Sequence, residues 1–78
     1  MAHINYLYKA NNMEIYLNGK KIDHRVIYEN ERGCGKVIRL MRVYHKKQNI
    51  AWASASTEKK AYLKMMAQLK AKYVVVSK

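Results

Sequence analysis

The sequence predicts an α+β domain in which an antiparallel sheet of three to four strands packs against one C-terminal amphipathic helix. Two observations carry this prediction. Short runs of strand-forming residues alternate with turn residues through the first two-thirds of the chain, and the segment that follows has the apolar period of a helix. A sheet with an apolar face needs a second layer, and one amphipathic helix is the simplest. Since the 78 residues include no proline and no linker-like tract, we expect one domain over residues 1–78.

The N-terminal part of the chain predicts one hairpin. Residues 3–12 fit either a short helix or an alternating strand. An apolar run follows over residues 13–17, and Asn18-Gly19 after it readily takes the two positive φ values of a tight hairpin turn. Lys20 starts the return strand, and strand-forming residues continue over residues 24–29.

Residues 36–45 predict the clearest strand. Each of its two faces mixes apolar residues with one arginine, Arg39 on one face and Arg42 on the other. We therefore expect these arginines near a rim of the sheet or in a functional role. Residues 30–35, which include two glycines, are expected to form the loop before this strand, and residues 46–49 the turn after it.

Residues 50–55 predict the next strand, whose two faces differ. One face carries only alanines, at positions 51, 53 and 55. Such small side chains indicate that a helix packs closely on that side. Trp52 lies on the other face, and we expect it in the core because aromatic residues dominate small cores.

The C-terminal helix has a clear start and one apolar stripe. Ser56 or Thr57 can cap its exposed amide groups, and Glu58 suits the positive end of the helix dipole. The stripe consists of Tyr62, Met65, Met66, Leu69 and Tyr73. The helix is expected to end near Tyr73, because the β-branched residues 74–76 favour an extended tail.

The charge of the chain points to a polyanion as its partner. Sixteen lysines and arginines against five acidic residues give a formal net charge of +11. A folded chain this short and basic carries the electrostatic footprint of nucleic-acid binding. The basic residues expected to contact RNA are Lys20, Lys21, Arg32, Lys36, Arg39, Arg42, Lys46, Lys47, Lys59, Lys60 and Lys64. Tyr28 and Tyr44 are the candidates for stacking on unpaired bases.

Catalytic and metal chemistry find little support in the sequence. Cys34, the only cysteine, could pair with His24 or His45 as nucleophile and base, but such pairs arise by chance and a Gly-Cys-Gly loop needs no catalytic explanation. These histidines and His3 lack metal-ligand spacing. We therefore expect no enzyme, no metal and no cofactor.

Location and assembly follow from the cysteine count and the short apolar runs. One cysteine cannot close an intramolecular disulfide, which favours a reducing compartment. No apolar run approaches the length of a membrane span, and the N-terminus lacks the pattern of a secretory signal. We expect a cytoplasmic protein, and a homodimer would give so small a core extra support.

One stretch of the sequence carries a family resemblance. From Val43 to Ala61 the chain runs in the order strand, turn, small-residue strand, helix cap, paired lysines and alanine. With this order, residues 25–70 resemble the double-stranded RNA-binding domain, a family with a helix, three antiparallel strands and a second helix. The resemblance implies a fold of that kind and favours RNA over DNA.

The resemblance also implies roles for individual residues. Lys59, Lys60 and Lys64 would face phosphates across the major groove of a duplex, and the loop over residues 33–36 would approach a minor groove. The sequence departs from the family at Glu58, which stands near where a lysine is expected. It departs again in its N-terminal part, where a hairpin is predicted and no first helix is evident.

Three functions fit these observations. The first is binding of structured or double-stranded RNA, mainly through its backbone and with little sequence specificity. The second is a small inhibitor or adaptor, of the kind phages make, that docks on an acidic partner protein or an RNA-handling enzyme. The third is membrane-surface binding through the basic amphipathic segment over residues 59–73.

Overall fold

The computed structural model describes residues 5–77 and contains two helices and two antiparallel three-stranded sheets. The elements in chain order are α1 (Tyr6–Asn12), β1 (Glu14–Leu17), β2 (Lys20–Ile22), β3 (Arg25–Gly33), β4 (Lys36–His45), β5 (Gln48–Ala55), α2 (Glu58–Lys72) and β6 (Val74–Val76). The predicted α+β class is confirmed. An antiparallel three-stranded sheet packed against the C-terminal helix is also confirmed. The prediction lacks the second three-stranded sheet, and residues 6–12 take the helical alternative.

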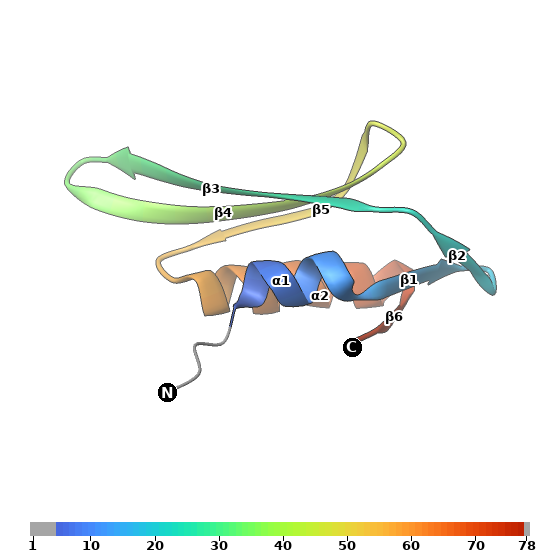
Figure 1. Cartoon of the computed structure of the whole chain (residues 1–78). Coiled ribbons are helices and arrows are strands. Elements are labelled where there is room, and N and C mark those ends of the chain that lie inside the picture. The colour runs from blue at the N-terminus through green and yellow to red at the C-terminus, as the bar shows by residue number, and fades with distance from the viewer. Residues whose placement is uncertain (1–4, 78) are drawn as a thin grey trace.

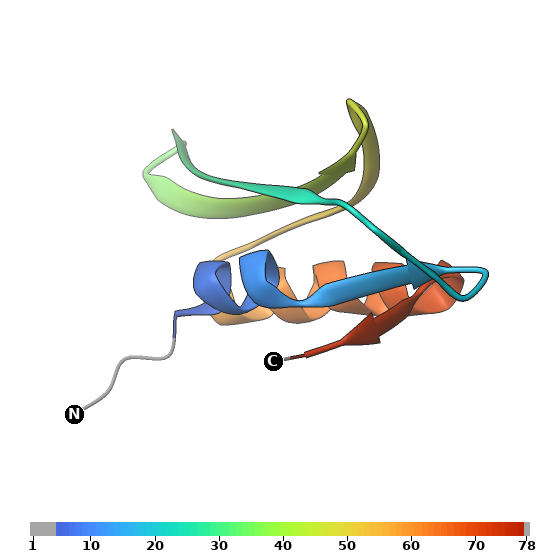
Figure 2. The same ribbon diagram turned by 45° about the vertical axis from the view of Figure 1, so that its right-hand side comes forward.

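The larger sheet, with strand order β3-β4-β5, forms one layer, and both helices lie together against one of its faces (Figure 1). The smaller sheet, β2-β1-β6, continues the helix layer at one end of the molecule (Figures 1 and 2). No described element covers the other face of the larger sheet. Among residues 5–77, neither helix has the length and apolar character that a membrane span requires.

Helix α1 settles the ambiguity of the N-terminal segment, of which residues 3 and 4 lie outside the described part of the chain. The Asn5 side chain caps the helix by accepting a hydrogen bond from the Tyr8 N–H at 2.9 Å. Ala10 is fully buried, and the Tyr6 ring lies 5.1 Å from the Tyr62 ring of α2, measured between centroids. Contact with α2 thus favours the helix over the alternating strand.

Three two-residue turns connect the antiparallel strands, and all have positive φ at both positions: Asn18-Gly19, Cys34-Gly35 and Lys46-Lys47. The hairpin predicted at Asn18-Gly19 is confirmed. The loop predicted over residues 30–35 is wrong for its first four positions, which extend β3, and residues 48–49 likewise extend β5. These residues stay in the ladder because a two-residue turn of this type already reverses the chain.

The hydrophobic core lies between the larger sheet and the helices. Met41, Met65 and Leu69 are completely buried in it, and Ala51 and Ala53 face α2 from β5. The close helix contact predicted from the alanines is therefore confirmed. By contrast, the prediction of a core tryptophan is wrong, because Trp52 points to the uncovered face and is 53% exposed.

The chain after α2 is extended, as its β-branched residues predict, and it also forms a strand. Val75 of β6 lies opposite Ile15 of β1, which is completely buried. The Tyr73 N–H donates to the Leu69 carbonyl at 2.8 Å and closes the last turn of the helix. Strand β6 therefore joins the C-terminal part of the chain to the N-terminal hairpin.

Candidate nucleic-acid interface

Nine of the eleven predicted basic residues fall into two groups at opposite ends of a molecule 44 Å long, and the other two, Arg39 and Arg42, lie within β4. Strands β3 and β4 run along the length of the molecule. The turn that joins them lies at the end where α2 starts. The β1–β2 turn and the β4–β5 turn lie at the opposite end (Figure 1). We name these the helix-start end and the hairpin end. The helix-start end carries Arg32, Lys36, Lys59, Lys60 and Lys64. The hairpin end carries Lys20, Lys21, Lys46 and Lys47.

The start of α2 holds its lysines in exposed positions. The Thr57 hydroxyl oxygen accepts a hydrogen bond from the Lys60 N–H at 3.2 Å, as predicted for a cap. Lys59 and Lys60 are exposed, and within the described residues neither forms an ion pair. Lys64 Nζ donates to the Ser54 carbonyl at 3.4 Å, which holds this side chain against the edge of β5.

Glu58 is the acidic residue among these lysines, and it also connects α2 to α1 and the sheet. Its Oε1 accepts a hydrogen bond from the Tyr6 N–H at 2.8 Å. Burial raises the pKa of Tyr28 above its ordinary value of 10.0, and the negative charge of nearby Glu58, which also hydrogen-bonds to it, raises it further. The positive charge of Arg39 acts in the opposite direction. The half-buried Tyr28 ring packs against the core.

Two of the predicted basic residues have carboxylate partners. Arg42 Nη1 lies 3.2 Å from Glu29 Oε1, and Lys21 Nζ lies 3.3 Å from Glu14 Oε2. Both pairs are partly exposed to water, where such contacts contribute little to stability.

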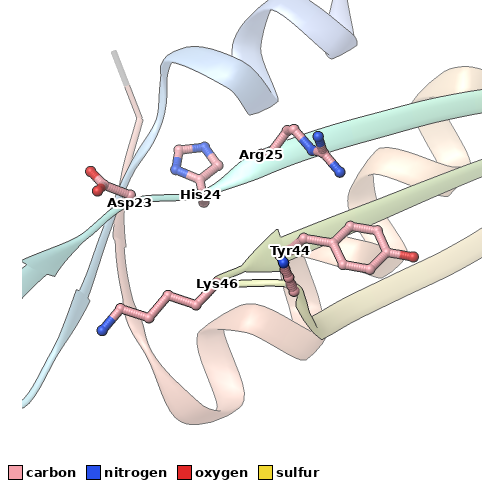
Figure 3. Close-up of a pocket in the computed structure, with 6 residues that line it drawn as sticks. Asp23, His24, Arg25, Tyr44 and Lys46 are labelled. Atoms are coloured by element: carbon pink, nitrogen blue, oxygen red, sulfur yellow. The ribbon is translucent and has the colours of Figure 1, made fainter.

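At the hairpin end a cavity of about 350 Å³ opens between the start of β3 and the β4–β5 turn (Figure 3). Its lining residues are Asp23, His24, Arg25, Tyr44, Lys46 and Lys47. Arg25 and Tyr44 are direct partners in the β3–β4 ladder, and their side chains extend the same way from neighbouring strands (Figure 3). Three basic side chains face one carboxylate here, so the cavity favours an anion.

Sequence reasoning missed Arg25, and only the strand register could have found it. The register pairs it with Tyr44 on the face of the larger sheet that no described element covers, and pairs Arg42 with Trp52 on the same face. We call this surface the open face. Its residues are Arg25, Ile27, Glu29, Glu31, Ile38, Leu40, Arg42, Tyr44, Trp52 and Ser54.

The cysteine and histidines that could have formed a catalytic pair lie apart. Cys34 is in the turn after β3, whereas His24 precedes that strand and His45 ends β4. Nine strand residues separate the two ends by about 30 Å. His24 Nε2 hydrogen-bonds to the Ala10 carbonyl at 2.8 Å, and His45 Nδ1 to the Asp23 carbonyl at 2.7 Å.

Within residues 5–77, no three side chains of His, Cys, Asp or Glu gather closely enough to hold a metal ion. Comparison with known proteins adds no assignment: no family model, no curated protein and no solved structure matches this chain.

Proposed function

We propose that this protein binds structured or double-stranded RNA, mainly through backbone phosphates and with little sequence specificity. One observation carries the proposal. In a chain of net charge +11, the exposed lysines at the start of α2 lie at the same end as Arg32 and Lys36, which flank the β3–β4 turn (Figure 1). Basic side chains gathered on two neighbouring elements can contact several phosphates of one duplex at once.

The preference for RNA over DNA rests on the resemblance of residues 25–70 to the double-stranded RNA-binding domain. Helix α1, the strands β3, β4 and β5, and helix α2 follow one another in the order that this resemblance implies, interrupted by the β1–β2 hairpin. In this proposal Lys59, Lys60 and Lys64 contact phosphates across the major groove, and the β3–β4 turn approaches a minor groove. The exposed free thiol of Cys34 suits the reducing cytoplasm.

The test is the salt dependence of RNA affinity. With about four to six phosphates neutralised, the logarithm of affinity should fall against the logarithm of salt concentration with a slope of roughly −3 to −5. Replacing both Lys59 and Lys60 with glutamine should make the slope less steep by about 1 per lysine. A duplex of about 16 base pairs is long enough for such a domain.

The matched control removes two charges from the other end of the same helix. Lys70 and Lys72 are exposed near the C-terminal end of α2, so the double substitution Lys70→Gln, Lys72→Gln changes the net charge equally. The control should keep the wild-type slope. A flat salt response in the wild type, or an equal effect of both double variants, contradicts the proposal.

The alternative proposal is an inhibitor or adaptor that docks on an acidic protein or an RNA-handling enzyme. The exposed lysines of α2 together with the exposed Trp52 favour it, because aromatic residues are enriched where proteins meet. Recovery of a partner from nuclease-treated extract would favour direct docking. Loss of the partner after nuclease treatment would favour RNA as the bridge.

A further inference from the structure

The open face joins exposed aromatic rings to the basic β4–β5 turn. Trp52 is 53% exposed there, and Tyr44 is half-buried on the neighbouring strand. Leu40, on the same face, is 9% exposed yet lies outside the core cluster. Both helices pack on the opposite side of the sheet (Figures 1 and 2). An aromatic, partly apolar surface thus faces solvent with no described element over it.

Basic side chains alternate with the aromatic rings on this surface. The strand register places Arg25 opposite Tyr44 and Arg42 opposite Trp52. Rings that offer a flat face, flanked by cations, are what single-stranded nucleic acid requires, because bases stack on aromatic side chains while phosphates need positive charge. The cavity at the hairpin end, about 350 Å³ and lined by Lys46 and Lys47, adjoins Tyr44 and extends the cationic track.

The turn beside the cavity keeps lysines where the backbone disfavours them. Lys46 and Lys47 have φ of 49° and 68°, whereas each of the other two turns places glycine at its second position. Lysine is disfavoured in this conformation, which glycine, asparagine and aspartate adopt more readily. Strain kept at an exposed turn suggests that the side chains are used, since folding alone would favour Asn-Gly.

The adjacent edge of the sheet is closed to a pairing strand. Gln68 of α2 accepts a hydrogen bond from the Trp52 N–H at 3.2 Å and donates one to the Trp52 carbonyl at 2.6 Å. Lys64 of α2 donates to the Ser54 carbonyl at 3.4 Å. A peptide strand adding to β5 would have to displace these hydrogen bonds, so a ligand for this region uses the face rather than the edge.

We propose that the open face, with the β4–β5 turn, binds an unpaired segment of RNA by stacking bases on Tyr44 and Trp52 and holding phosphates with Arg25, Lys46 and Lys47. This inference rests on the proposed function and adds a second surface to it, for single strands beside a duplex. Two rings give room for about two stacked bases. The carboxylates of Asp23 in the cavity and of Glu29 and Glu31 farther along the face limit the track to this stretch.

The intrinsic fluorescence of Trp52 is a direct readout, because it is the only tryptophan in the chain. The probes are a short oligouridylate, a blunt duplex, and the same duplex with an oligouridylate overhang. We expect the oligouridylate to quench Trp52 saturably, and the overhang to bind more tightly than the blunt duplex. Tyr44→Ala should weaken oligouridylate binding by about 5- to 160-fold, the range for removing one ring on which a base stacks.

Two further variants separate stacking from other effects. Trp52→Ala should weaken oligouridylate binding about as much as Tyr44→Ala does. Because this variant lacks the tryptophan, its binding is measured by the fluorescence anisotropy of a labelled oligouridylate. Tyr8→Ala removes a ring that is 65% exposed on α1, away from the open face, and should leave oligouridylate affinity unchanged. Circular dichroism of each variant checks that it folds.

The outcomes distinguish the two proposals. One outcome is that blunt duplex binds in a salt-dependent manner, oligouridylate does not quench Trp52, and Tyr44→Ala does not change oligouridylate affinity. This inference is then overturned and the proposed function stands. If no nucleic acid binds, both fail. If Trp52 emission changes with protein concentration alone and RNA does not alter it, a second copy of the chain covers the open face, and the inference is again overturned.

Discussion

The carboxylate of Glu58 accepts a hydrogen bond from the Tyr6 N–H at 2.8 Å, between residues that are 52 positions apart. The contact joins the starts of α1 and α2, and it places the one acidic residue of the helix start beside Lys59 and Lys60. Glu58 therefore stabilises the fold, and its negative charge would oppose the polyanion binding proposed for the same end of the molecule. Substitutions can separate these two effects.

Glu58→Ala should lower the free energy of unfolding by about 1.5–3 kcal/mol, because it removes a hydrogen bond to a charged acceptor and leaves a partly buried N–H unpaired. Glu58→Gln keeps an oxygen acceptor and should lose less. Urea denaturation of both variants measures the difference. Both should bind RNA more tightly than the wild type, because a negative charge beside the lysines is gone. An equal loss of stability in the two variants would contradict the role given to the hydrogen bond.

Tyr28 should make the fold sensitive to alkaline pH. Its pKa is raised in the folded state by burial first and by the charge of Glu58 second, so folding favours the neutral phenol. This stabilisation is complete below the unfolded-state pKa, about 10, and is lost as pH rises through the higher folded-state pKa. Tyr28→Phe should show a shallower loss of stability above pH 10.

The phenolate absorbance of the tyrosines tests the same assignment without unfolding the protein. Glu58→Gln should lower the pKa of Tyr28, because the charge that disfavours the phenolate is removed. Arg39→Gln should raise the pKa, because Arg39 favours the phenolate. If neither substitution changes the pKa of Tyr28, the proximity of Glu58 and Arg39 to its hydroxyl is contradicted.

Ala53 sets how closely α2 approaches the larger sheet. Its side chain is 4% exposed beneath the helix, and a larger side chain would have to displace packed neighbours. Ala53→Leu should therefore lower the free energy of unfolding by about 1–3 kcal/mol. The control Ser54→Leu adds bulk at the next residue, on the open face, and should cost much less. Thermal unfolding of the two variants makes the comparison.

The features that local sequence predicted are those that local chemistry determines. Asn18-Gly19 specifies its turn because both residues tolerate positive φ, and Thr57 caps α2 because its hydroxyl reaches an N–H three residues ahead. The alanines of β5 correctly indicated the helix that packs on them. In each case the residues that decide the structure are close in sequence or lie on one face of one strand.

The features that sequence could not predict depend on distant partners. Helix α1 is one, since its start bonds to Glu58 and its Tyr6 ring contacts α2. Trp52 is another, because the alanines of β5 indicate a helix on their own side but say nothing of whether any element covers the opposite side. The open face was also not predicted, because only the register between β3 and β4 shows that Arg25 lies beside Tyr44.

The lysines of the β4–β5 turn should lower the stability of the fold and increase its affinity for oligouridylate. Replacing Lys46 with Asn and Lys47 with Gly gives the dipeptide that this turn favours, and should raise the free energy of unfolding by about 1 kcal/mol. The same change removes two charges beside the cavity. Oligouridylate affinity should fall, and its salt slope should become less steep by about 0.7 for each phosphate that is no longer neutralised.

Two control variants separate the effect of turn geometry from the effect of charge. Cys34→Asn improves the β3–β4 turn in the same way without changing charge, so urea denaturation should show a gain in stability there too. The double variant Lys70→Gln, Lys72→Gln removes two charges from the last turn of α2, in the helix layer and not on the open face, and should leave oligouridylate affinity nearly unchanged. If the Asn-Gly turn is more stable and still binds oligouridylate as the wild type does, the strain at Lys46 and Lys47 has no connection with binding.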